Sequence, residues 1–438
     1  MNKKKQILAG LLLAALLVPL QGAQDLTLTG AIQTGLEHNF GIRISRQNLE
    51  IARNNNTWGA AGRYPVIDLN LGQSNSFTDR PSTSAGDTRD KFTTNTLTPS
   101  LTMRWTLFNG FGIKIAKQKL MLLNDLSEGN AAIMVENTIQ GIVLAYYNVL
   151  LQQEKLATVQ TVQKLSQDRF QYVKDRKALG TATTFDELQA KIAYLDDTSA
   201  VLLQEFSLNS ARRALNLLLG QPEHTAYNLT DKFEAPLDNY NIDPLLEKMK
   251  QGNKTLRNQY ISQHILRKDV ALQKSALWPK LSLNSGAQLT NTRLKYEGLS
   301  AATSNTYNYY VNFTLSLNIF NGGNTKRAIA NARIQEKIGN LQMEEIQLTL
   351  ENTLRNILEL YNARKQLFRV AEERIKSAKL NMDISTEKFR AGAINSFNYR
   401  DVQLLYLNSA IGSYQAIYDL IETHTDLARL TGGIISEY

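Results

Sequence analysis

The feature that most constrains this chain is an alternating strand pattern that occurs twice and ends each time at Phe-Asn-Gly. In residues 97–107, mostly apolar side chains alternate with Thr, Ser and Arg, and residues 309–319 repeat the alternation. A period of two places apolar side chains on one face of a β-strand and polar ones on the other. Gly110 and Gly322 then permit a sharp turn before a long helical pattern begins. The sequence therefore predicts one strand-to-helix corner, used twice.

Each of these strands has a predicted partner upstream. After Pro65 and again after Pro279, leucines and isoleucines alternate with polar residues, and stretches rich in turn-forming residues follow at 77–92 and 291–308. Such an arrangement is typical of a β-hairpin with a long polar loop. The pattern predicts two hairpins, at about 65–108 and about 279–320.

The rest of the chain reads as helix. No proline occurs between Pro99 and Pro222 or after Pro279, and apolar residues recur at steps of three and four. The pattern predicts long helical hairpins over 112–219 and 324–430, preceded by single helices over 26–58 and 245–277. A helix of about 70 residues is about 100 Å long, which is too long for a globular domain.

The second half of the chain retraces the first. Matching residues lie 212 to 215 positions apart. The pairs are Pro65 and Pro279, Gly110 and Gly322, Glu136 and Glu351, Tyr147 and Tyr361, and Gly180 and Gly392. We interpret the chain as a tandem duplication with a first repeat at 24–220, a linker at 221–243 and a second repeat at 244–438.

The N-terminus has the composition of a secretory signal. Three lysines precede an apolar run over residues 7–20, and Gly22 and Ala23 suit a cleavage site. The alternative is a membrane anchor, but the run is short of the ~20 residues that a span needs. Residues 1–23 are therefore predicted to be a signal peptide, and the mature protein is predicted to leave the cytoplasm.

Composition argues against several classes of function. The chain has no cysteine, and its four histidines lie far apart, so no metal site or cofactor is predicted. The net charge of +9 is spread without a basic tract, which does not indicate nucleic acid binding. No phosphate-binding loop or nucleophile motif is present, and an enzyme is not expected.

Four strands with one apolar face point to a barrel shared between subunits. Strands of about ten residues can cross an outer-membrane-type bilayer, but small barrels need about eight strands, and an open edge in lipid leaves backbone groups unpaired. Two copies would supply eight strands and three would supply twelve. The alternative is the edge of a soluble β-sandwich, which explains neither the secretion signal nor the helix lengths.

With these features, the chain resembles the TolC family of outer membrane efflux proteins. The resemblance rests on the duplicated layout, the Phe-Asn-Gly corners, and the turn segments ALGTATTFDELQA and RAGAINSFNYRDVQL. It implies an α+β membrane protein of a Gram-negative bacterium. Three copies would form a twelve-stranded barrel in outer-membrane lipid and a periplasmic α-barrel, with residues 220–244 and the C-terminal residues in an equatorial belt.

The resemblance also implies a function. Family members are passive exit ducts for drug efflux or type I protein secretion, joined by a periplasmic adaptor to an inner-membrane transporter. The alternative is a periplasmic coiled-coil scaffold without a channel, which accounts for the helices but not for the symmetrically placed strands.

Two groups of candidate site residues follow from the resemblance. The turns at Gly180, Thr181, Gly392 and Ala393 would be the tips that contact the adaptor, although glycine also simply ends helices. The periplasmic entrance would be narrowed by residues at the positions of the family's two lumen-facing acids, which in this chain are Asn398 and Asp401.

A third entrance residue is Asp186 in the first repeat. The resemblance makes it a candidate partner of the arginine that helps to lock the closed entrance in the family. The family's locking arginine is replaced by Ile394, and Arg400 is expected to face away from Asp401. The alternative for both aspartates is that they are solvated acids near helix starts, where the helix dipole favours them.

Overall fold

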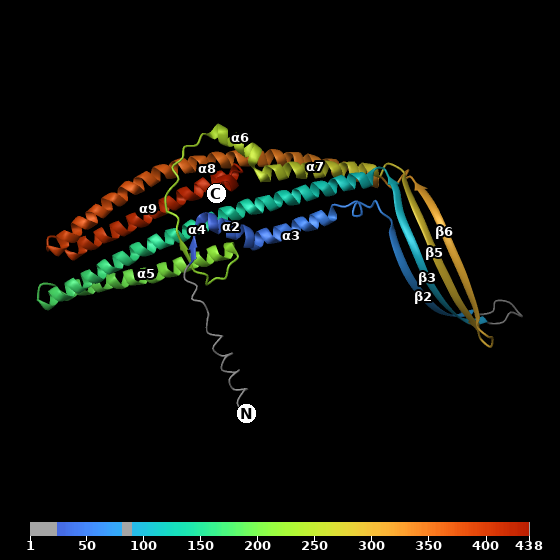
Figure 1. Cartoon of the computed structure of the whole chain (residues 1–438), viewed down its shortest axis with the longest axis horizontal. Coiled ribbons are helices and arrows are strands. Elements are labelled where there is room, and N and C mark those ends of the chain that lie inside the picture. The colour runs from blue at the N-terminus through green and yellow to red at the C-terminus, as the bar shows by residue number, and fades with distance from the viewer. Residues whose placement is uncertain (1–23, 81–89, 438) are drawn as a thin grey trace, which may run out of the picture. The chain divides into compact units, whose positions relative to one another are not determined.

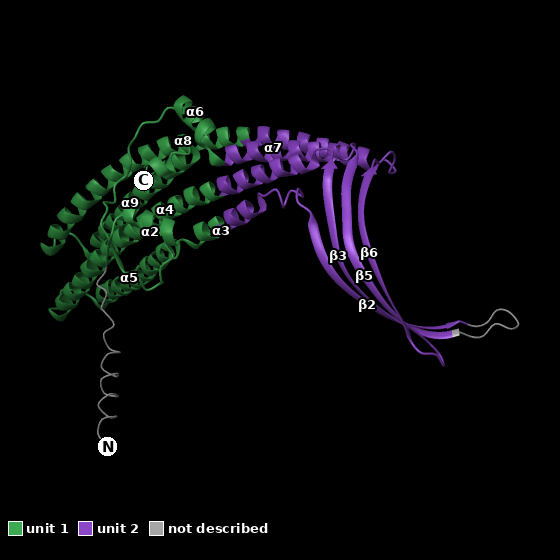
Figure 2. Ribbon diagram, turned by 45° about the vertical axis from the view of Figure 1, so that its right-hand side comes forward, with its two compact units in different colours: residues 1–46, 131–254, 347–438 green, residues 47–130, 255–346 purple. Residues whose placement is uncertain are grey.

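The computed structural model describes residues 24–80 and 90–437. The predicted signal peptide at 1–23 lies outside the described residues. The chain divides into two compact units, coloured separately in Figure 2, and unit 2 comprises residues 47–130 and 255–346. Unit 1 comprises the other described residues.

The order of elements in the second half of the chain follows that of the first. Two helices lead to two strands, and a 67-residue helix and a shorter returning helix come next. The helices are α2 (Leu28–His38), α3 (Phe40–Asn55), α4 (Gly112–Ala178), α5 (Thr184–Leu219), α6 (Ile242–Gly252), α7 (Lys254–Ser275), α8 (Asn324–Arg390), α9 (Ser396–Leu430) and α10 (Ile434–Glu437). The strands are β1 (Gln24–Leu26), β2 (Val66–Arg80), β3 (Asp90–Asn109), β4 (Tyr227–Leu229), β5 (Lys280–Tyr296) and β6 (Ala302–Ser316).

Unit 2 contains one antiparallel sheet in the order β2-β3-β5-β6, and Figure 1 shows the four strands side by side. The two predicted hairpins thus pair with each other through β3 and β5. The outer strands β2 and β6 each have a neighbour on one side only. Among the residues that the structure describes, the sheet is therefore open at both edges.

The register gives this sheet one apolar face. Side chains that share a row come from all four strands, because paired residues point to the same side. One row is Ile67, Met103, Ser285 and Val311, and the next is Leu69, Leu101, Ala287 and Tyr309. Leu69 is 80% exposed and Tyr309 is 75% exposed. This face therefore presents to its surroundings the apolar side chains that a soluble protein would cover.

The opposite face of the sheet is polar. Arg104 on β3 pairs with Asp68 on β2 at 2.7 Å, and Asn284 on β5 lies opposite Asn312 on β6. The alternation predicted from the sequence is confirmed, with one apolar and one polar surface on the same strands.

The strand ends differ from the sequence expectation. Both hairpins extend into the segments expected to be loops, and only residues 297–301 separate β5 from β6. In contrast, β6 stops at Ser316 instead of continuing to Phe320. Ser316 pairs with Lys280, and the next partner would be Pro279, which has no N–H to donate.

The Phe-Asn-Gly corners form as predicted. Gly110 has φ 64° and Gly322 has φ 68°, the left-handed region that glycine adopts without strain. The asparagine before each glycine caps the helix that follows. Asn109 Oδ1 accepts from the N–H of Ile113 at 3.0 Å, and Asn321 Oδ1 accepts from the N–H of Thr325 at 3.3 Å. The asparagine therefore starts a helix in both copies, whereas the tripeptide ends a strand only in the first, because β6 stops at Ser316.

The core of unit 1 holds the connecting segment 221–243 through two buried tyrosines. Tyr146 on α4 donates its hydroxyl to Asp231 Oδ2 at 2.6 Å, and Tyr361 on α8 donates to the carbonyl oxygen of Pro236 at 3.1 Å. Both side chains are fully buried. The structural counterpart of Tyr361 is thus Tyr146, one residue earlier than the pairing with Tyr147 expected from the sequence.

The helices expected to be continuous over 26–58 and 245–277 are each broken once. The breaks lie at Asn39, between α2 and α3, and at Asn253, between α6 and α7. The side-chain amide of Asn39 donates to the carbonyl oxygen of Leu218 at 2.8 Å, and that of Asn253 donates to Leu430 at 2.9 Å. Each asparagine therefore binds the end of a returning helix, a tertiary contact that periodicity does not reveal.

Candidate functional site

The predicted tip residues lie in two turns of the same geometry in unit 1. Gly180 has φ 74° and Gly392 has φ 71°. The N–H of Thr181 donates to Arg176 O at 2.8 Å, and the N–H of Ala393 donates to Lys388 O at 2.8 Å. These bonds satisfy carbonyls at the helix ends, as in the Schellman motif. A Cβ at either glycine would meet nothing within 4 Å, so glycine is required for its backbone angle.

Asp186 lies in the first turn of α5, where it completes a capping box with Thr183. The N–H and hydroxyl of Thr183 both donate to Asp186 Oδ2, at 2.9 Å and 2.7 Å. These hydrogen bonds, led by that from the hydroxyl, lower the pKa of Asp186 below its ordinary value. The structure thus shows a capping role for this carboxylate.

Asn398 and Asp401 lie on the exposed side of α9. The backbone N–H of Asn398 donates to its cap, Asn395 Oδ1, at 2.8 Å. Asp401 is exposed and has no hydrogen bond or ion pair with any described residue. Tyr399 and Gln403, on the other side of the helix, are buried. The structure therefore leaves Asn398 and Asp401 free to face an aqueous space.

The strongest electrostatic contact near the turns involves Arg400, for which the sequence indicated only that it faces away from Asp401. Its guanidinium binds both carboxylate oxygens of Asp197 on α5, at 2.6 Å and 2.8 Å. Ser166 on α4 donates its hydroxyl to the same carboxylate. Asp197 is 5% exposed, so the pair is shielded from solvent. Sequence reasoning missed this link because its members lie 203 residues apart.

A second arginine, Arg169 on α4, is buried beside this pair. It donates to the carbonyl oxygen of Ser396 on α9 at 3.0 Å. Burial, followed by repulsion from Arg400, lowers the pKa of Arg169 to about 10, so it remains charged at neutral pH. One buried carboxylate thus faces two cations, which ties the starts of α5 and α9 to α4.

Aromatic stacking reinforces the same region. Phe389 on α8 stacks on Tyr399 on α9 with ring centroids 4.5 Å apart, and the ring of Tyr172 on α4 meets Phe389 edge-on at 5.0 Å. Such pairs add stabilisation beyond their buried area. Near the turns, the helices are therefore held together by an aromatic cluster and by the ion pair between Arg400 and Asp197.

A comparison with known protein families decides the family. The family model described as "Outer membrane efflux protein" matches residues 31–221 and again residues 245–433. The chain belongs to the outer membrane efflux protein family. Outer membrane protein TolC of Vibrio cholerae serotype O1 is 24% identical to this efflux protein over 302 residues, covering 67% of this chain and 68% of the relative.

Solved structures share the fold of this efflux protein. The CmeC outer membrane channel of Campylobacter jejuni has a TM-score of 0.75 at 15% identity, with 93% of this chain and 85% of that chain covered. The open-state MtrE outer membrane channel of Neisseria gonorrhoeae has a TM-score of 0.69 at 16% identity, with 93% and 89% covered.

Family membership confirms the predicted family, the channel character and the location in the outer membrane. The protein is an outer membrane efflux channel protein with a periplasmic extension, and its relatives are channels rather than enzymes. Across residues 24–80 and 90–437, no helix has the length and apolar character of a membrane span. Nor does this described part of the chain gather three or more His, Asp or Glu side chains suited to a metal ion.

Proposed function

We propose that this chain is one subunit of a homotrimeric exit duct. The duct passively conducts drugs, other small molecules or proteins that an inner-membrane transporter delivers through a periplasmic adaptor. The observation that carries the proposal is the four-stranded sheet with an apolar face and two open edges. Unpaired backbone groups in lipid cost several kcal/mol each, so β2 and β6 need strands from other copies.

The number of copies follows from the size of the barrel. Eight strands enclose an interior that side chains nearly fill, whereas wider barrels leave an aqueous channel. Three copies supply twelve strands from the four in each chain. The polar face would then line the lumen, and the apolar face would contact lipid.

The helices support the same assembly, because α5 is apolar on two opposite sides. Its buried side, which includes Ala190, Ala193 and Leu208, has the spacing of a helix seam. A second seam on the other side is exposed. It consists of Leu188, Ile192, Leu195, Leu202 and Phe206, each at least 50% exposed. A seam of this kind calls for a helix that this chain does not supply.

Helix α7 shows how a shorter helix docks on the two long helices. Within unit 2, α7 contacts both long helices. Lys268 binds Gln118 on α4 at 3.0 Å, and Gln263 binds Asn340 on α8 at 2.6 Å. In the first half of the chain, α3 occupies the position that α7 has in the second half. Helix α8 has an exposed apolar row that includes Ile334, Leu341 and Leu348. We propose that α3 of one copy docks on α8 of the next and so closes the ring.

The parallel between α3 and α7 rests on a tandem duplication, which we also propose. Its repeats are residues 24–220 and 244–438, joined by a linker at 221–243. Support comes from the two separate matches to the family model and from the equal roles of Asn39 and Asn253 at the helix breaks.

The site assignments from the sequence complete the proposal. Asn398, Asp401 and Asp186 narrow the periplasmic entrance, and the turns at 180–181 and 392–393 contact the adaptor. The exposure of Asp401 and of both glycine turns supports this assignment.

The decisive experiment compares two arginine substitutions on β6. Phe313 lies on the apolar face and Asn312 on the polar face. Phe313→Arg should cost about 2 to 4 kcal/mol per site near the bilayer midplane and reduce assembly. Asn312→Arg should assemble and change conductance in planar bilayers.

The mass of the detergent-solubilised parent protein should correspond to three chains. A stable monomer would contradict the proposed duct. So would equal assembly and equal conductance of the Phe313→Arg and Asn312→Arg variants. A periplasmic scaffold would tolerate both substitutions and would not conduct, but family membership already argues against that alternative.

A further inference from the structure

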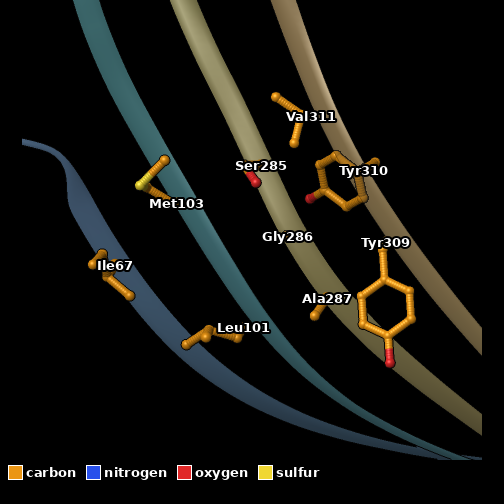
Figure 3. Close-up of a pocket in the computed structure, with 9 residues that line it drawn as sticks. All are labelled: Ile67, Leu101, Met103, Ser285, Gly286, Ala287, Tyr309, Tyr310 and Val311. Carbon is orange, nitrogen blue, oxygen red and sulfur yellow. The ribbon is translucent and has the colours of Figure 1, made fainter.

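A trough runs along β5 on the apolar face of the sheet. At its centre, Ser285 and Ala287 carry small side chains on this face, and the backbone of Gly286 lies between them. Figure 3 shows these residues between larger side chains of the flanking strands. The flanking side chains are Leu101 and Met103 on β3, and Tyr309 and Val311 on β6. The hollow measures about 500 Å³, within the usual range for small-ligand sites.

The trough continues toward the hairpin end of β5. A second hollow of about 310 Å³ shares Ala287 and Tyr309 with the first and adds Leu289 and Tyr307. Both hollows are lined mainly by the apolar side chains of this face. The trough has its floor on the inner strand β5, and the edge strand β6 forms one of its walls. Its floor therefore stays accessible when other copies pair with β2 and β6.

Two cationic side chains, Arg293 and Lys295, lie beyond the hairpin end of the trough. Arg293 and Lys295 follow Leu289 on the same face of β5, because alternate residues of a strand point to the same side. Four residues of strand, from Leu289 to Arg293, span about 13 Å. Both cationic side chains are exposed, and neither forms an ion pair or hydrogen bond with a described residue.

The side chains directly opposite these cations on the neighbouring strands are neutral. Arg293 lies opposite Asn95 on β3 and Thr303 on β6, and Lys295 lies opposite Thr93. The carboxylate of Glu297, at the hairpin turn, is paired with Lys91 at 3.8 Å. Two uncompensated positive charges therefore border an apolar trough at the height where the apolar band of the sheet ends.

We propose that this trough binds an acyl chain of a phosphate-bearing lipid in the outer leaflet, with the lipid phosphate bound by Arg293 and Lys295. Hydrocarbon fits the apolar trough, and phosphate oxygens accept charge-assisted hydrogen bonds from Arg and Lys. Basic side chains at the membrane surface favour anionic headgroups by the same attraction. The site requires only that the sheet lies in the outer membrane, so it is independent of conduction by the duct.

Lipid retention by the full-length protein in detergent tests this site. The protein would be equilibrated with diphosphoryl lipid A or with the same lipid lacking its phosphates, and bound lipid would be counted by native mass spectrometry. The parent should retain the diphosphoryl form, and Arg293→Gln combined with Lys295→Gln should lower its retention about tenfold or more. The matched control is Lys280→Gln, an exposed lysine at the other end of β5, which should retain lipid as the parent does.

A second variant tests the trough. Ala287→Phe fills it and should reduce retention of both lipids, whereas Leu283→Phe, outside the trough on the same face, should not. If Ala287→Phe does not assemble, Ser285→Val provides the same test with a smaller side chain. Equal retention by the parent and the Arg293 and Lys295 double variant would overturn the proposal. So would full displacement of the lipid by inorganic phosphate, because the acyl chain would then contribute nothing.

Discussion

Asp197 is the buried carboxylate that links α5 to Arg400 on α9 and lies beside Arg169 on α4. Removing one partner of a buried pair typically costs about 3 to 5 kcal/mol. Asp197→Ala should therefore loosen α5 and α9 near the turns and speed amide hydrogen exchange there. Asp196→Ala, at the exposed neighbouring position, is the matched control. Similar exchange in the two variants would show that the pair does not hold these helices.

Asp401, a proposed entrance residue, is expected to control which ions pass. Asp401→Ala should reduce cation selectivity and relieve block by multivalent cations from the periplasmic side, because the proposed trimer would lose three exposed carboxylates. Single-channel recording measures both properties. If the variant matches the parent in both, Asp401 is a surface residue away from the entrance.

Asp186→Ala should act less on selectivity than on the resting open fraction, since Asp186 caps α5. The cap depends on the ionised carboxylate, whose pKa is lowered in the folded protein. Its contribution to stability is therefore present above the ordinary pKa of aspartate and is lost as the pH falls through the lowered value. Thr183→Val, which removes the hydroxyl contacts of the capping box but keeps the Asp186 charge and its bond from the backbone N–H of residue 183, separates the two effects. An open fraction altered by Asp186→Ala and unchanged by Thr183→Val would assign the effect to the carboxylate charge.

At the scale of the element, the two glycine turns carry the adaptor prediction. Bulky substitutions at Thr181 and Ala393 should abolish export while the protein remains in the outer membrane. Both side chains are exposed, and the space around the neighbouring glycines is open, so a larger side chain should not disturb the fold. Export of a marker compound and fractionation measure the two outcomes. Unchanged export would count against docking at these turns, and loss of the protein from the membrane would indicate a structural role.

At the scale of the whole molecule, the ring predicts contacts between copies. Lys268 on α7 binds Gln118 on α4. The helix breaks at Asn39 and Asn253 relate Lys268 to Asn54 on α3, and the buried tyrosines Tyr146 and Tyr361 relate Gln118 to Arg333 on α8. We therefore expect Asn54 of one copy to lie near Arg333 of the next. The chain has no cysteine, so Asn54→Cys with Arg333→Cys adds the only thiols. A bismaleimide should link copies into dimers and trimers on a denaturing gel.

Gln335 provides the control for this crosslink. It lies two residues beyond Arg333, about 200° round the helix, so Asn54→Cys with Gln335→Cys should crosslink far less. Equal crosslinking by both pairs, or none by either, would argue against docking of α3 on α8.

The sequence by itself determined the elements whose cause is local. Period-two alternation predicted the two faces of the sheet, the absence of proline predicted α4 and α8, and Phe-Asn-Gly predicted the corners, because each depends on residues adjacent in the chain. The strand limits were less predictable, since the extent of β5 and the early end of β6 depend on which partners remain to pair.

Tertiary structure alone decided the contacts between distant residues. The breaks at Asn39 and Asn253 exist because a side-chain amide meets the end of another helix. The pairing of Arg400 with Asp197 and the trough along β5 likewise join segments far apart in the chain. Local periodicity records which side of an element is apolar, but the partner that covers that side is set only when the whole chain folds.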